Sequence, residues 1–117
     1  MVSTQPGFHR LDLCAADEVP PGTMKLCEAE DELVLVANLN GAYHATQGVC
    51  SHEYFELDRG TLMGDSVTCM LHLSRFSLID GEVSDPPAEL PLAVYDVVLD
   101  GGRVFIEVPE GPLLVNR

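Results

Sequence analysis

The feature that most constrains this chain is a pair of short motifs that each combine a cysteine with a histidine. The first reads C-x-H at residues 50–52 and the second reads C-x-x-H at residues 69–72. Thiolate sulfur and imidazole nitrogen are common metal ligands in proteins. A centre held by Cys50, His52, Cys69 and His72 requires a fold that brings both segments to one place.

Two kinds of metal centre use two cysteines and two histidines. Structural zinc takes such a set tetrahedrally, but zinc fingers usually pair the two cysteines in one motif and the two histidines in another. A Rieske [2Fe–2S] centre places two cysteines on one iron and two histidines on the other. Because each half of this sequence is mixed, we favour the iron–sulfur centre. A zinc-stabilised binding module remains the alternative.

The residues around these motifs resemble those of Rieske-type ferredoxins. In that family the first motif is followed by Leu, Gly, Gly and Val, and the second by Phe, Gly and Pro-Pro. The corresponding positions are Leu57, Gly60, Gly64, Val67, Phe76, Gly81, Pro86 and Pro87. Met70 stands where the family usually has Pro, and Leu73 where a Gly often follows the second His. Neither departure is at a ligand position. The resemblance covers about residues 8–110.

The resemblance implies one Rieske-type [2Fe–2S] cluster, with Cys50 and Cys69 on one iron and His52 and His72 on the other. No iron position is then left open to a substrate, so we expect an electron carrier with no catalytic residues. The expected partners are a flavin-containing ferredoxin reductase and the terminal oxygenase of an aromatic-ring-hydroxylating dioxygenase, which dock at the cluster tip. A small Rieske subunit of a nitrite reductase-like enzyme is the alternative carrier.

The pattern along the chain predicts an all-β fold. Asn-Gly at residues 40–41 and Asp-Gly at 80–81 and 100–101 separate apolar runs, which is a strong hairpin signal. The expected strands span residues 8–14, 24–29, 33–39, 42–46, 75–79, 82–84, 95–99 and 103–108, with one helical turn within 15–22.

The family fold further implies one Rieske domain over residues 1–117. Its base would be an antiparallel β-sandwich or barrel, formed by residues 8–47 and 88–110. A small cluster-binding subdomain of about residues 48–87 would be inserted into this base.

The composition is strongly acidic, with 19 Asp and Glu against 6 Lys and Arg and a formal net charge of −13. Such a surface disfavours nucleic acid and anionic membranes and favours partners with basic patches. No apolar run approaches 18 residues and the N-terminus has no signal-peptide core, so we expect a cytoplasmic protein. We also expect a monomer. Some of the acids that flank the motifs should share a rim with the ligands: Glu53, Glu56, Asp58, Asp65, Glu82 and Asp85.

Three further residues have two interpretations each. Cys14 and Cys27 lie in strand-like stretches and could form a disulfide, but a reducing compartment disfavours one. We interpret them as two small buried hydrophobes. Ser74 is either a hydrogen-bond donor to a cluster sulfur or a hydroxyl that faces solvent.

Overall fold

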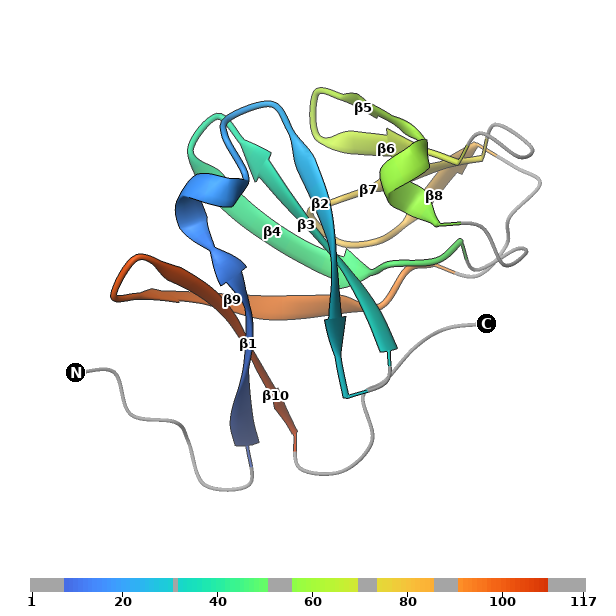
Figure 1. Ribbon diagram of the computed structural model, residues 1–117. Coiled ribbons are helices and arrows are strands. Elements are labelled where there is room, and N and C mark those ends of the chain that lie inside the picture. Colours follow the sequence, from blue (N-terminus) through green and yellow to red (C-terminus); the bar gives the residue numbers. More distant parts are fainter. Residues whose placement is uncertain (1–7, 31, 51–55, 70–73, 86–90, 110–117) are drawn as a thin grey trace.

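The computed structural model describes residues 8–30, 32–50, 56–69, 74–85 and 91–109 of the chain (Figure 1). Strands dominate this part, and helical structure is confined to two short 3₁₀ turns, η1 (Ala16–Glu18) and η2 (Leu57–Arg59). The all-β prediction is therefore confirmed. No helix in these ranges is long and apolar enough to cross a membrane.

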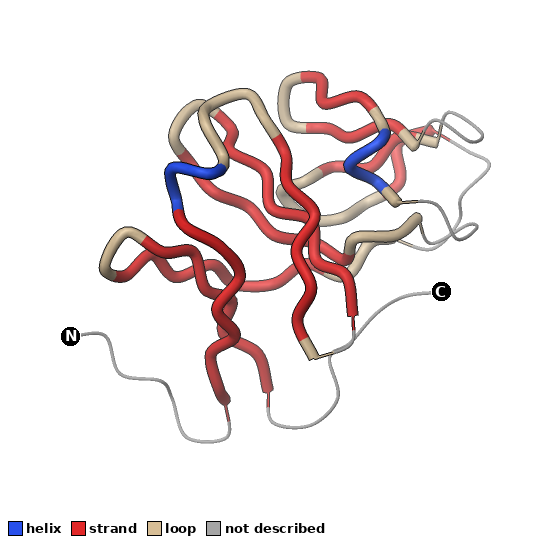
Figure 2. Tube along the Cα trace, in the orientation of Figure 1, coloured by secondary structure: helices blue, strands red, loops and turns tan. Residues whose placement is uncertain are grey.

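A six-stranded antiparallel sheet forms the larger part of the molecule, and its strand order is β1-β10-β9-β4-β3-β2. The strands are β1 (Phe8–Ala15), β10 (Arg103–Pro109), β9 (Val94–Asp100), β4 (Ala42–Gln47), β3 (Glu32–Leu39) and β2 (Met24–Ala29). β9 connects the two halves of this sheet, because it pairs with β10 over most of its length and with β4 at Tyr95 and Val94. The sheet curls until its two edge strands, β1 and β2, lie side by side (Figures 1 and 2).

A second antiparallel sheet lies beside the first and has four short strands in the order β5-β6-β7-β8. They are β5 (Thr61–Met63), β6 (Ser66–Thr68), β7 (Arg75–Ser77) and β8 (Val83–Asp85). This sheet is built from the segment that carries both motifs, and it appears at the upper right of Figure 1.

The expected hairpins are present in both sheets. The Asn40-Gly41 turn joins β3 to β4, and both residues have positive φ angles, as this type of turn requires. Residues 101–102, both glycine, likewise join β9 to β10 with positive φ. The β5–β6 hairpin was not predicted, because strands of three residues give too short an alternation for a pattern to stand out.

One hydrophobic core cluster spans both sheets. Leu35 and Ala37 of β3 pack there with Val67 of β6 and Phe76 of β7, and all four are fully buried. Two further clusters fill the inside of the curled sheet. The small sheet is thus fixed to the large one by a shared core, and this contact determines where its loops lie.

Candidate metal centre

The first motif begins where the chain leaves β4 and is closed at its base by backbone contacts. Val49 and Glu56 form an isolated antiparallel bridge, and the Leu57 N–H donates to the carbonyl of Gly48 at 2.8 Å. Cys50 is the first residue inside this closure and is 5% exposed. His52 lies outside the described residues.

The second motif is the loop between β6 and β7. The Cys69 N–H donates to the carbonyl of Ser74 at 2.8 Å, which closes the loop at its base. Cys69 is 1% exposed and continues from a strand whose register with β7 is regular. His72 lies outside the described residues, as do the two departures from the family pattern, at positions 70 and 73.

The fold brings Cys50 and Cys69 into one core cluster. Neither forms a disulfide, and both pack in the cluster that contains Leu57 and Phe76. Two buried thiols that stand at the bases of two separately closed loops suit a bridging metal group better than a disulfide, because each loop is held in place on its own. Within the described ranges no three potential metal-binding side chains meet. Two of the four expected ligands fall outside those ranges.

Gln47 supports the first loop, although it is not among the site residues predicted from the sequence. Its side chain is fully buried, and the amide Nε2 donates to the carbonyl of Val49 at 2.9 Å. Its Oε1 accepts the backbone N–H of Ala93 at 2.7 Å. The amide therefore ties the residue that precedes Cys50 to the chain entering β9. Its only sequence signal was a polar residue at the end of a strand that precedes a motif.

Two glycines allow close backbone approach beside the motifs. A Cβ at Gly60 would collide with the carbonyl oxygen of Thr68, the residue that precedes Cys69. Gly81 has a φ of +78°, and a Cβ there would collide with the carbonyl oxygen of Leu92. Both positions matched the family pattern, and the structure gives each a steric reason.

Ser74 is 1% exposed and lies at the start of β7, beside Cys69. The alternative in which its hydroxyl faces solvent is therefore wrong. Its hydrogen bond to a cluster sulfur stays a prediction. Phe76, two residues further on, is fully buried in the cluster that holds both cysteines.

The acidic residues near the motifs divide between the two ends of the small sheet. Glu56 and Asp58 follow directly on the first loop, and the Glu56 carboxylate lies 3.5 Å from Nε of Arg59. Asp65 and Glu82 lie at the opposite end, because the carbonyl of Asp65 accepts from Leu78 and that of Glu82 from Ser77. Three strand residues, or about 10 Å, separate the two ends. Glu53 is outside the described residues.

The two histidines outside the motifs have ordinary structural surroundings. His9 Nε2 lies 2.8 Å from a carboxylate oxygen of Glu30. His44 is half-buried within β4, opposite Ala37 of β3.

Comparison with known proteins identifies the family. The model of the Rieske [2Fe-2S] domain matches residues 9–96. The chain belongs to the Rieske [2Fe–2S] family. It therefore binds one Rieske-type [2Fe–2S] cluster, which agrees with the donor set of the two motifs.

Relatives of this Rieske protein include components of dioxygenase systems. The biphenyl dioxygenase ferredoxin subunit of Pseudomonas sp. (strain KKS102) is 35% identical over 101 residues, which cover 86% of this chain and 93% of the relative. A chain in the solved complex of reduced oxygenase and oxidized ferredoxin in carbazole 1,9a-dioxygenase is 29% identical. It has a TM-score of 0.78, with 90% of this chain and 97% of that chain covered.

A likeness to nitrite reductase small subunits extends to the fold. A solved structure assigned as the small subunit of an NADH-dependent nitrite reductase from Mycobacterium tuberculosis has a TM-score of 0.74. It is 24% identical, and 86% of this chain and 95% of that chain are covered. At this identity the likeness shows the fold alone.

Proposed function

We propose that this Rieske protein carries single electrons from a flavin-containing reductase to the terminal oxygenase of an aromatic-ring-hydroxylating dioxygenase. The observation that carries the proposal is the burial of Cys50 and Cys69 in one core cluster, each at the base of a loop that backbone hydrogen bonds close. The match to dioxygenase ferredoxins over nearly their whole length supports the choice of system.

We propose Cys50 and Cys69 as the ligands of one iron and His52 and His72 as the ligands of the other. When bound, such a cluster takes up and gives back one electron at a potential raised by its histidine ligands. The protein's part is to hold the ligands still. Backbone hydrogen bonds at Val49 and Ser74 fix the base of each loop, and the Gln47 amide adds a further hydrogen bond at the base of the first loop. With four ligands from the chain no iron position is left for a substrate, which fits a carrier rather than an enzyme.

We also propose that residues 48–87 form the cluster-binding subdomain, and residues 8–47 and 88–110 the base. The four-stranded sheet from Thr61 to Asp85 supports the first range, and the six-stranded sheet supports the second. We propose a monomer in the cytoplasm. The absence of a disulfide among Cys14, Cys27, Cys50 and Cys69 supports the location, since disulfides are rare in reducing compartments.

The ligand assignment is tested by metal analysis of the purified protein. Iron and acid-labile sulfide in a one-to-one ratio, with an EPR signal that appears on reduction, would support it. Stoichiometric zinc with no such signal would contradict it. Cys50→Ser and His52→Cys variants should each change that signal, while Cys14→Ala, which removes a thiol outside the motifs, should leave it unchanged.

The place of the protein in the electron path is tested with a flavin-containing dioxygenase reductase and a terminal oxygenase from the same organism. Product formation by the oxygenase should require all three proteins. Oxygenase turnover that is equally fast without this chain would contradict the proposal, as would transfer of its electrons to a nitrite reductase large subunit alone.

We propose that docking uses acids at the loop end of the small sheet. Asp58 is exposed directly after the first loop, whereas Asp65 is exposed at the other end of the sheet. Asp58→Asn should slow association with the reductase at low salt more than the matched control Asp65→Asn. The difference should shrink as the ionic strength rises, because the Debye length is only about 8 Å at physiological salt. Equal rates for the two variants would contradict docking at this end.

A further inference from the structure

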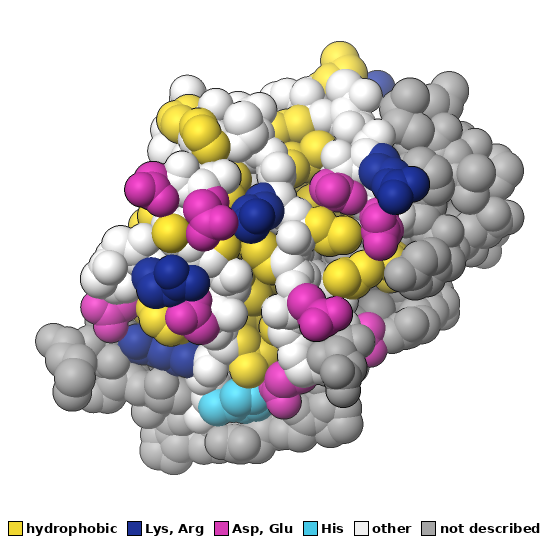
Figure 3. Space-filling view, in the orientation of Figure 1, with side chains coloured by type: hydrophobic (Ala, Val, Ile, Leu, Met, Phe, Trp, Pro, Cys, Tyr) yellow, Lys and Arg dark blue, Asp and Glu magenta, His cyan; other side chains and the backbone are white. Residues whose placement is uncertain are grey.

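The two edges of the six-stranded sheet meet in a seam that backbone hydrogen bonds do not close. β1 and β2 lie side by side, yet in the described part of the chain each pairs with only one strand, β1 with β10 and β2 with β3. A band of hydrophobic side chains is visible on the face between these two strands (Figure 3). Side chains must therefore hold the seam together.

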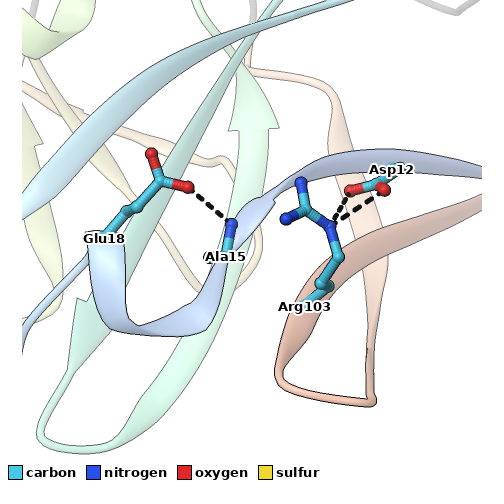
Figure 4. Close-up of polar contacts among 4 residues, drawn as sticks. All are labelled: Asp12, Ala15, Glu18 and Arg103. Atoms are coloured by element: carbon cyan, nitrogen blue, oxygen red, sulfur yellow. Dashed lines mark hydrogen bonds and ion pairs between the residues drawn. The ribbon is translucent and has the colours of Figure 1, made fainter.

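Ion pairs mark both ends of the seam. At one end His9 of β1 contacts Glu30, which follows β2, at 2.8 Å. At the other end Nζ of Lys25 in β2 lies 3.6 Å from a carboxylate oxygen of Glu18. The same carboxylate accepts the backbone N–H of Ala15, the last residue of β1, at 2.7 Å (Figure 4).

Cys14 of β1 and Cys27 of β2 lie on the seam between the two ion pairs. They are 2% and 6% exposed and belong to one core cluster with Val36 and Val104. Their side chains are close enough for each to influence the pKa of the other. The antiparallel order of the two ion pairs places these cysteines between them. They take no part in the cluster site, whose cysteines are at positions 50 and 69.

We propose that Cys14 and Cys27 form a reversible dithiol site, which a small-molecule disulfide oxidises to an intramolecular disulfide that closes the seam covalently. The site is reduced under ordinary conditions and becomes oxidised when the thiol–disulfide balance of its surroundings shifts. Cytosolic disulfides of this kind are typically transient and redox-sensing.

The surroundings of the two thiols give them different roles. Burial raises the pKa of Cys14, while Cys27 and the cations of Lys25 and Arg103 oppose that rise and Glu18 adds to it. Burial, followed by the charge of Cys14, raises the pKa of Cys27 to about 12. In the proposed reaction Cys14 is the attacking thiol, since Lys25 and Arg103 stabilise its thiolate against the effect of burial.

The reaction is an ordinary thiol–disulfide exchange. Cys14 loses its proton, its Sγ attacks one sulfur of the small disulfide, that S–S bond breaks, and one small thiolate leaves and takes up a proton. Cys27 then loses its proton and its Sγ attacks Cys14 Sγ, which expels the second small thiol. Two protein thiols are oxidised, and one disulfide is reduced to two thiols.

Access to the buried thiols depends on opening of the seam. An edge contact without a backbone ladder opens at lower cost than the hydrogen-bonded strands on either side of it. Removal of an end contact should therefore speed the reaction. Glu30→Gln weakens the pair with His9, and Glu28→Gln removes the same charge from β2 itself without touching that pair.

The experiment treats the cluster-loaded, oxidised protein with hydroxyethyl disulfide in oxygen-free buffer. An uncharged reagent is used because the chain has a net charge of −13. Trypsin cleaves after Lys25, between the two cysteines, and a glutamate-specific protease then separates Cys27 from Cys50. We expect a Cys14–Cys27 linked peptide that dithiothreitol separates, an unchanged cluster absorption band, and a thermal midpoint several degrees higher.

Matched variants complete the test. Cys14→Ala and Cys27→Ala should give no linked peptide and no rise of the thermal midpoint with the reagent. Glu30→Gln should form the link several-fold faster than Glu28→Gln, and equal rates would overturn the role of seam opening. The site itself would be overturned by a stable mixed disulfide at either cysteine without a bridge. It would also be overturned if the folded protein resisted the reagent while the urea-unfolded chain reacted.

Discussion

Replacement of Gln47 by Met removes the hydrogen bonds that its fully buried amide forms with Val49 and Ala93, while it keeps the length of the side chain. The carbonyl of Val49 and the N–H of Ala93 then lose their partners at 2.9 and 2.7 Å. A buried polar group left unsatisfied costs about 1–3 kcal/mol, so the two together should cost about 4 kcal/mol. With a urea dependence of roughly 2 kcal/mol per M, the unfolding midpoint should fall by about 2 M.

Thr46→Val is the matched control for this change. Thr46 is the neighbouring residue, is also fully buried, and its hydroxyl donates to the carbonyl of Gln47 at 3.0 Å. That variant loses one hydrogen bond outside the ligand loop and should cost about 1 kcal/mol.

Two probes follow unfolding in urea: far-UV circular dichroism reports the strands, and visible absorption reports the cluster. In Gln47→Met the cluster signal should be lost at lower urea than the strand signal, because Val49 precedes Cys50. In Thr46→Val the two signals should move together. The role assigned to Gln47 would be refuted if both variants lowered the midpoints equally and kept the two signals coincident.

Three further changes test other parts of the structure. Ser74→Ala should lower the reduction potential of the cluster by some tens of millivolts. A hydrogen bond is worth roughly 1 kcal/mol, and about 59 mV corresponds to a factor of ten in the equilibrium constant of a one-electron reduction. An unchanged potential in a voltammetric titration would show that the Ser74 hydroxyl forms its hydrogen bond elsewhere. Glu18→Gln should be less stable than the wild type at pH 7, and the gap should close in acid. The hydrogen bond from Ala15 lowers the pKa of Glu18 below its ordinary 4.5. The stability that the Glu18 carboxylate contributes is therefore complete above pH 4.5 and is lost as the pH falls through the lower pKa of the folded state. A difference in urea midpoints that stayed constant down to about pH 3 would contradict this. Gly60→Ala should destabilise the protein and disturb the EPR signal, because its Cβ meets the carbonyl of Thr68; a normal spectrum and midpoint would show that the backbone there yields easily.

The sequence predicted the large sheet better than the small one. Strands such as β3 and β4 are long enough for an alternation to be recognised, and the Asn40-Gly41 turn located their hairpin to within a residue. β5 and β6 have three residues each, and their pairing depends on the shared core rather than on local pattern. Local signals could not reveal that dependence.

The motifs were sufficient to predict the chemistry of the site, but they did not predict the residues that hold its loops in place. The spacing of residues 50–52 and 69–72 indicated the ligand types, and the structure buries both cysteines in one cluster. Gln47 could not be recognised, because its role depends on Ala93, which lies 46 residues away along the chain. The contact between Cys14 and Cys27 arises from the curl of the sheet, which no local pattern encodes.

The core cluster that spans both sheets limits how such a domain can be re-engineered. Leu35 and Ala37 belong to the large sheet, yet they pack in the cluster that contains both motif cysteines. If residues 48–87 were grafted onto a foreign β-barrel, the inner face of that segment would pack against side chains that do not complement it. The metal-binding segment cannot therefore be exchanged by itself, and a functional chimera would also need the β3 residues that pack against it.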